Sequence, residues 1–204
     1  MSAPVLYLAS RSPRRQALLT QLDIEFEPLL LREAAGRARD VVEKALDAEP
    51  PAHYVERMAR TKAQVGRRRV EDRGLAARPV LGADTEVVLD GDVFGKPRDA
   101  EDAQRMVRRL SGRTHQVLTA VALCHQERTE VEVSVSRVTL RRLGASEIER
   151  YVASGEPYDK AGGYAVQGRA AAFISRIEGS YTGVVGLPLY ETAALLARIG
   201  MPIL

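Results

Sequence analysis

The stretch "VLYLASRSPRRQALLTQL", residues 5–22, decides the fold. Its opening apolar run predicts a short buried strand, and the leucines that follow the proline and the two arginines recur at helical spacing. Ser12 suits the N-cap position and Pro13 the first helical position. We therefore predict a strand, a tight turn and a helix, which is a unit of α/β architecture.

Arg14 and Arg15 fall in the first turn of this predicted helix. Cations are unfavourable there, because the unpaired amide groups and the helix dipole already make that end positive. An anion bound at the turn would make the positive charges of Arg14 and Arg15 favourable there, and Ser10 and Ser12 would add hydrogen-bond donors around it. We favour a phosphate site over the alternative, a surface helix whose arginines extend into water.

The bulk composition indicates one folded domain over residues 1–204. The chain is 45% hydrophobic and 28% charged, and its net charge of +3 allows an anionic partner without requiring nucleic acid. Cys124 is the single cysteine, which excludes an intramolecular disulfide, and its alternating apolar surroundings predict a core residue. No apolar run is long enough to span a bilayer. We expect a soluble cytoplasmic protein that binds neither membrane nor nucleic acid.

The rest of the chain predicts a mixed sheet with helices, an α/β to α+β fold. Residues 78–97 read as a strand, an acidic turn, a second strand and a hairpin signal at Asp90-Gly91. Two alternating runs, 115–125 and 129–140, predict a pair of long antiparallel strands. Residues 32–51 are weakly patterned and predict a loop or a partial helix, whereas residues 52–74 predict a long charged helix.

Two charged residues suggest phosphate chemistry. Asp84 follows an apolar strand, where a carboxylate could bind Mg²⁺ or orient a water; the alternative is a turn aspartate bonded to its own backbone. Lys96 lies between Gly95 and Pro97, and these rigid flanks suit a point charge directed at a phosphate. An ordinary exposed loop lysine is the alternative.

A glycine-rich segment, "GEPYDKAGGYAVQG" at residues 155–168, allows close approach of the backbone to a ligand. The amide of Gln167 can both donate and accept, which suits the edge of a nucleobase; a purely structural loop is the alternative. His53, His115 and His125 lack the spacing of metal ligands, so we predict no zinc site.

Taken in order, "LYLASRSPRR", "VLGADTEVVLDGDVFGKP", "LSGRTHQVLTAVAL", "GEPYDKAGGYAVQG" and "IEGSYTGVVGLPLYETAALL" resemble the Maf family of nucleoside triphosphate pyrophosphatases. The resemblance covers nearly the whole chain apart from residues 32–51. It implies a two-lobed fold like that of the ITPases, with a central mixed sheet and a cleft between the lobes. It also implies a nucleoside triphosphate substrate, a divalent cation (Mg²⁺ or Mn²⁺) and a homodimer.

The resemblance also assigns roles to individual residues. Asp84 matches the family's catalytic proton acceptor. The positions that mark the branch acting on dTTP and UTP match Arg14, Thr85 and Gln167. The phosphate-site or metal-site positions match Ser10, Arg15, Lys62 and Lys96.

One feature departs from the family pattern. Members usually carry an Asp-Glu pair ahead of the lysine-bearing helix, and the glutamate position corresponds to Glu43, but Val42 precedes it. We take Glu43 as the second carboxylate, joining Asp84 as a catalytic and metal-binding residue, with Glu33 as the alternative.

The resemblance implies hydrolysis of dTTP and UTP, with modified pyrimidine nucleotides as further candidates, to the monophosphate and pyrophosphate. Such an activity would prevent incorporation of non-standard nucleotides, and the family has a link to cell-division arrest. Two alternatives stay open: a pyrophosphatase of the sibling branch acting on 7-methyl-GTP, and a non-catalytic septum or nucleic-acid-binding factor.

Overall fold

The computed structural model describes residues 5–32 and 40–203. The chain forms two compact units. The first comprises Met1–Asp84, Thr119–Val133 and Gly186–Leu204, and the second comprises Thr85–Leu118 and Ser134–Val185. Three strands contribute residues to both units: β3 (Val80–Leu89), β5 (Thr114–His125) and β6 (Arg128–Leu140).

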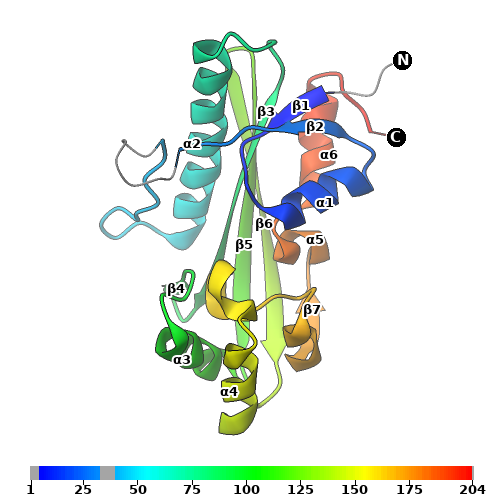
Figure 1. Ribbon diagram of the computed structural model, residues 1–204. Helices are drawn as coiled ribbons and strands as arrows, with labels where there is room; N and C mark the ends of the chain where they lie inside the picture. The colour runs from blue at the N-terminus through cyan, green and yellow to red at the C-terminus, as the bar shows by residue number, and fades with distance from the viewer. Residues whose placement is uncertain (1–4, 33–39, 204) are drawn as a thin grey trace. The chain divides into compact units, whose positions relative to one another are not determined.

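The first unit begins with the predicted strand–turn–helix. Strand β1 (Val5–Leu8) pairs in parallel with both β2 (Glu25–Pro28) and β3, and helix α1 (Pro13–Gln21) connects β1 to β2 (Figure 1). Ser12 is the N-cap of α1 and Pro13 its first residue, as predicted. Helices α2 (Pro51–Asp72) and α6 (Leu189–Arg198) complete this unit. Arg198 of α6 pairs with Glu130 and Glu132 of β6.

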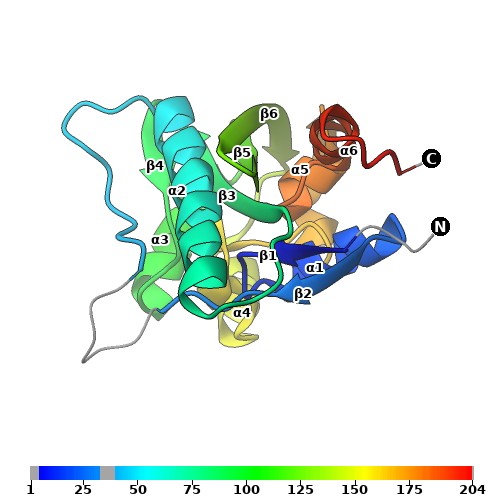
Figure 2. The same cartoon turned by 90° about the horizontal axis from the view of Figure 1, so that it is seen from above.

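Helix α2 packs unusually closely on β3 (Figure 2). A Cβ atom added to Gly82 would lie 2.6 Å from the backbone nitrogen of Ala63 and 2.7 Å from the carbonyl oxygen of Ala59. Only glycine therefore allows the two backbones to approach this far. The close approach matters for the site, because Lys62 adjoins Ala63 and Asp84 lies two residues after Gly82.

The second unit has its own apolar core. It contains the remaining parts of the three shared strands together with short strands, helices and 3₁₀ turns. These elements are β4 (Asp92–Phe94), α3 (Ala100–Leu110), α4 (Ala145–Ala153), η1 (Glu156–Asp159), η2 (Ala161–Gly163), η3 (Arg169–Phe173), β7 (Ile174–Glu178) and α5 (Tyr181–Val185). Buried residues such as Val107, Leu110 and Ile148 bring α3 and α4 together over Val117 and Val138 of the strands.

The mixed α/β prediction is confirmed, since the strand order is β2-β1-β3-β5-β6-β7 with β4 paired to β3. The Asp90-Gly91 hairpin is also present, with positive φ angles of 55° and 86° at the two turn residues. The predicted long strands are β5 and β6, which a two-residue connection joins as a hairpin.

The predicted acidic turn is wrong. Asp84 lies inside the continuous ten-residue strand β3, so it neither ends a strand nor caps a turn. Charged residues normally interrupt a buried strand, but here the Asp84 carboxylate has a cationic partner on α2, which allows the ladder to continue.

Two further predictions can be compared with the structure. The described part of the 32–51 segment contains no helix before α2, and Cys124 is buried as a core residue. Within residues 5–32 and 40–203, no helix combines the length and the apolar character needed to cross a membrane.

Candidate active site

Two carboxylates of the first unit meet at the ammonium of Lys62. Its Nζ lies 2.6 Å from Oδ1 of Asp84 and 2.6 Å from Oε1 of Glu43. Lys62 comes from the middle of α2, Asp84 from β3 and Glu43 from the segment that precedes α2. The side chains of Lys62 and Asp84 are only 13% and 10% exposed, whereas that of Glu43 is 53% exposed. The set is therefore open to solvent on the Glu43 side.

The charge state of Lys62 follows from its neighbours. Burial lowers the pKa of the ammonium, but Asp84 and Glu43 raise it, and the net result is a pKa above the ordinary value despite opposition from Arg15. Lys62 therefore stays protonated and acts as a cation rather than as a proton acceptor.

Asp84 keeps one carboxylate oxygen available. Oδ1 accepts the hydrogen bond from Lys62, while the buried Oδ2 has no hydrogen-bond partner among the described residues. A buried, unpaired anionic oxygen is costly unless a ligand, a water or a cation completes it. The arrangement thus leaves one buried oxygen of Asp84 without a hydrogen-bond partner among the described residues.

The carboxylates suit a hard divalent cation. Mg²⁺ prefers oxygen ligands and is usually held by one or two carboxylates together with waters and substrate phosphates. Asp84 and Glu43 supply two such carboxylates, and no cluster of three or more His, Cys, Asp or Glu residues suited to a metal occurs in the described ranges. The donor set fits a cation shared with a phosphate ligand. Glu33, the alternative second carboxylate, lies outside the described residues.

Arg15 is turned from the start of α1 toward this set. Its Nε donates to the carbonyl oxygen of Gly186 at 2.7 Å, and its Nη1 donates to Oγ of Ser10 at 3.3 Å. Burial lowers the pKa of the guanidinium, Asp84 and Glu43 counteract this, and Arg14 adds to the lowering. The protein's own carboxylates thus stabilise part of the positive charge in the first helical turn. The sequence alone predicted that a bound anion would supply all of this stabilisation.

The structure therefore brings together five of the predicted residues within the first unit. They are Ser10, Arg15, Glu43, Lys62 and Asp84. Arg14 adjoins them in the first turn of α1. The other three belong to the second unit: Thr85 follows Asp84 on β3, Lys96 is exposed after β4, and Gln167 is exposed before η3.

Sequence reasoning missed the residue that holds the Gln167 loop in place. The carboxylate of Glu156 accepts hydrogen bonds from the backbone N–H groups of Arg169 (2.8 Å) and Ala170 (3.2 Å), and from the Tyr151 hydroxyl (3.1 Å). A Cβ at Gly168 would lie 2.5 Å from this carboxylate. Gly168 thus leaves the space that the Glu156 carboxylate occupies. In the sequence, the Glu-Pro pair at the start of the loop was the feature that could have pointed to this contact.

A second missed contact joins the same loop to β5. His115 is 2% exposed, its Nε2 lies 2.7 Å from the Tyr164 hydroxyl, and the two rings meet edge to face. Burial lowers the pKa of His115 to about 4, so the folded protein keeps this imidazole neutral at pH 7.

The buried histidine predicts acid sensitivity. Between pH 6.5 and 4 the unfolded chain binds a proton at His115 that the folded chain does not, so stability falls as the pH falls through this window. The contribution amounts to about 3 kcal/mol between pH 7 and pH 4. Urea unfolding of the wild type and His115→Gln at both pH values should show a loss of stability that is larger in the wild type by about this amount. Equal pH dependence of the two proteins would contradict it.

These elements define an α/β protein in which two carboxylates, a buried ammonium and a helix-start arginine gather in one unit, as suits an anionic substrate bound with a cation. Comparison with known proteins agrees with this class. The sequence model of the Maf-like protein family matches residues 5–199, so the chain belongs to the Maf family.

Full-length relatives carry a more specific name. A "dTTP/UTP pyrophosphatase" of Nitrosospira multiformis is 58% identical over 191 residues, covering 94% of this chain and 92% of that protein. A protein of the same name from Aromatoleum aromaticum is 54% identical, and the alignment covers 97% of each chain. Another from Nitrosomonas europaea is 52% identical, and the alignment covers 97% of this chain and 96% of that protein. Among solved structures, that of the Staphylococcus aureus Ham1 protein aligns with a TM-score of 0.44 and 12% sequence identity. The alignment covers 67% of this chain and 71% of the Ham1 chain.

Proposed function

We propose that this chain is a pyrophosphatase that hydrolyses dTTP and UTP to the nucleoside monophosphate and pyrophosphate. The names of relatives that match it over nearly their whole length support this substrate class. The observation that carries the chemistry is the unpaired Oδ2 of Asp84, fixed beside a protonated lysine. A carboxylate held in this way can accept a proton from an attacking water.

In the proposed reaction, water adds to the phosphoric anhydride that joins the α and β phosphates. One phosphorus–oxygen bond forms to the water oxygen, the anhydride bond breaks, and pyrophosphate leaves. Asp84 orients the water and takes up its proton. Lys62 keeps Oδ1 of Asp84 occupied, so Oδ2 is the oxygen that acts.

Charge neutralisation falls to the remaining residues of the first unit. Mg²⁺ or Mn²⁺, held by Asp84 and Glu43 together with the phosphates, would supply a positive charge that stabilises the developing negative charge on the leaving group. Arg15 and the amide groups at the start of α1 provide an anion site for the phosphates, with Ser10 as a further donor.

Nucleotide selection is assigned to residues matched by the family motifs. Arg14, Thr85 and Gln167 stand at the positions that mark the dTTP and UTP branch, and Lys96 stands at a phosphate-site position. An exposed amide such as that of Gln167 is chemically suited to reading a pyrimidine edge. The contacts of Glu156 around Gly168 fix the backbone next to this amide.

A panel of nucleotides tests the proposal. The purified protein with Mg²⁺ should release pyrophosphate fastest from dTTP and UTP, in equal amounts with the monophosphate, and slowly from ATP, GTP and 7-methyl-GTP. A preference for 7-methyl-GTP would replace the proposed substrates with those of the sibling branch. Absence of turnover on every nucleotide would instead support a binding protein.

We also propose that the protein works in the cytoplasm as a homodimer. The single cysteine, which is buried and unpaired, is compatible with a reducing compartment. The dimer rests on the family alone, and sedimentation of the purified protein at micromolar concentration tests it.

A further inference from the structure

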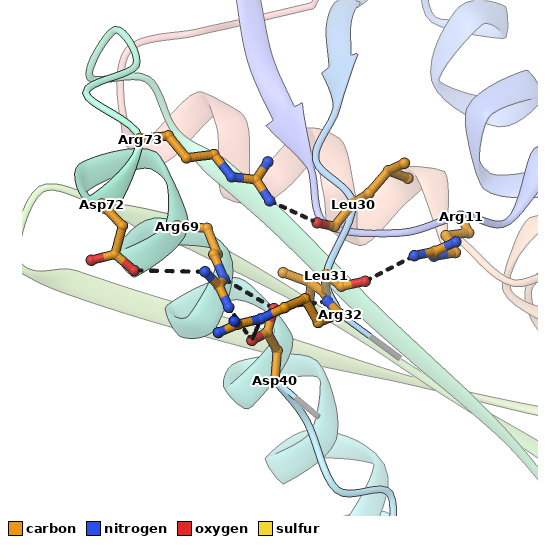
Figure 3. A network of polar contacts seen from close by, with 8 residues as sticks. All are labelled: Arg11, Leu30, Leu31, Arg32, Asp40, Arg69, Asp72 and Arg73. Atoms are coloured by element: carbon orange, nitrogen blue, oxygen red, sulfur yellow. Dashed lines mark hydrogen bonds and ion pairs between the residues drawn. The ribbon is translucent and has the colours of Figure 1, made fainter. Parts of the chain in front are cut away.

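Asp40 is the most extensively paired carboxylate near the segment that carries Glu43. Its side chain is only 5% exposed. Arg69 donates hydrogen bonds to both of its oxygens, with Nε 3.0 Å from Oδ2 and Nη2 2.5 Å from Oδ1. Arg32 adds its Nε at 3.1 Å and its backbone N–H at 2.8 Å. Figure 3 shows the two guanidinium groups converging on this carboxylate.

The same network fixes the chain on both sides of residues 33–39. The backbone N–H of Asp40 donates to the carbonyl oxygen of Arg32 at 3.1 Å, so the two flanking residues are tied together. Arg11 and Arg73 donate to the carbonyl oxygens of Leu31 and Leu30, which anchors the approach to Arg32 (Figure 3). Asp40 is therefore held at a fixed position beside Arg32.

From Asp40 the chain reaches Glu43 in three residues, a step that spans at most about 10–11 Å. The cations that hold the two carboxylates, Arg69 and Lys62, are seven residues apart on α2. Seven residues make about two helical turns, which places both cations on one face about 10.5 Å apart along the axis. The reach of residues 40–43 covers the axial distance between the two cations, so α2 can hold this segment at both ends.

The far side of Glu43 is anchored as well. Arg57, also on α2, donates to both oxygens of Glu49 at 2.6 Å and to the carbonyl oxygen of Lys44 at 3.0 Å. Glu43, half exposed, lies between these two attachments. A flexible side chain on a segment without helix or strand is placed accurately only where its backbone is held, and these attachments hold it.

We propose that Asp40 is a positioning residue, whose ion pairs with Arg69 and Arg32 set the position of Glu43 beside Lys62 and Asp84. This inference rests on the proposed function for the role of Glu43. It also gives a physical account of the departure from the family pattern at Val42. The neighbouring acidic position is apolar here, and the buried carboxylate that anchors the segment stands two residues earlier.

The test compares Asp40→Asn with Glu147→Gln. Glu147 is a matched control in the second unit, because it likewise accepts two hydrogen bonds from one arginine and one from a backbone N–H, here of Arg141 and Gly144. For Asp40→Asn, the Mg²⁺ concentration that gives half the maximal rate on dTTP should rise about tenfold or more. Saturating Mg²⁺ should restore most of the rate, and Glu147→Gln should behave as the wild type.

A second readout needs no turnover. Mn²⁺ binding, followed by electron paramagnetic resonance in the presence of α,β-methylene-dTTP, should weaken to a similar degree in Asp40→Asn only. If the wild type released no pyrophosphate, the proposed function would fail while this titration still decided the role of Asp40.

Unchanged Mg²⁺ and Mn²⁺ dependence in Asp40→Asn, or an equal change in Glu147→Gln, would overturn the proposal. Should Asp40→Asn not fold, Arg69→Lys decides the matter. Lysine keeps the positive charge but cannot donate to both oxygens of Asp40 as the guanidinium does. We therefore expect a smaller rise in the Mg²⁺ concentration that gives half the maximal rate.

Discussion

Asp84→Asn should lower the rate of pyrophosphate release from dTTP by about 10³-fold, because a positioned general base contributes about 10²–10⁴-fold to such reactions. Asparagine keeps the size of the side chain, and its oxygen can still accept from Lys62, but it cannot take up a proton. Nucleotide binding should persist, because Arg15 and the start of α1 still bind the phosphates and the loss of a negative charge near a polyanion offsets the weaker hold on the cation. Steady-state kinetics and calorimetric titration of α,β-methylene-dTTP measure the two effects separately.

Asp90→Asn is the matched control for this experiment. Asp90 adjoins the end of the same strand, and its carboxylate pairs with Arg113 at an exposed position. Asparagine tolerates the positive φ angle of 55° found there. The control should retain wild-type kinetics, and an Asp84→Asn variant that also retained them would remove Asp84 from the reaction.

Gly82→Ala should destabilise the protein by about 3 kcal/mol, at the upper end of the usual cost of overpacking a core. The added methyl group would meet backbone atoms of Ala59 and Ala63 at 2.7 Å and 2.6 Å, and helix backbone cannot move aside as a flexible side chain can. Displacing α2 from β3 would also separate Lys62 from Asp84, so activity should fall as well. Urea unfolding monitored by circular dichroism measures the loss of stability.

Gly95→Ala serves as the control for the stability measurement. A Cβ at Gly95 meets no atom within 4 Å, so its stability should stay within about 0.5 kcal/mol of the wild type. If Gly82→Ala were as stable as this control, α2 and β3 would not be held at the distance described above.

Local chemistry made part of this structure predictable. The turn into α1 follows from the capping preference of Ser12 and the fixed φ angle of Pro13, both of which act within a few residues. The Asp90-Gly91 hairpin is equally local. The grouping of Lys62, Asp84 and Glu43 was predictable only because the ordered motifs resemble a family.

The contacts that sequence reasoning missed join residues far apart in the chain. Gly82 looks like an ordinary strand glycine until Ala59 and Ala63 of α2 are seen against it. Asp40 stands in a weakly patterned segment, and Arg69 is one of several similar arginines on a charged helix. The acidic turn was wrongly predicted for the same reason, because the partner that lets Asp84 stay within a buried strand is 22 residues away.

The central claim is that the wild-type protein cleaves the bond between the α and β phosphates of dTTP. Phosphorus-31 NMR of a reaction with dTTP and Mg²⁺ tests it most directly, because each possible product has its own resonances. The account predicts dTMP and pyrophosphate in equal amounts, with no dTDP. Accumulation of dTDP and orthophosphate would contradict it.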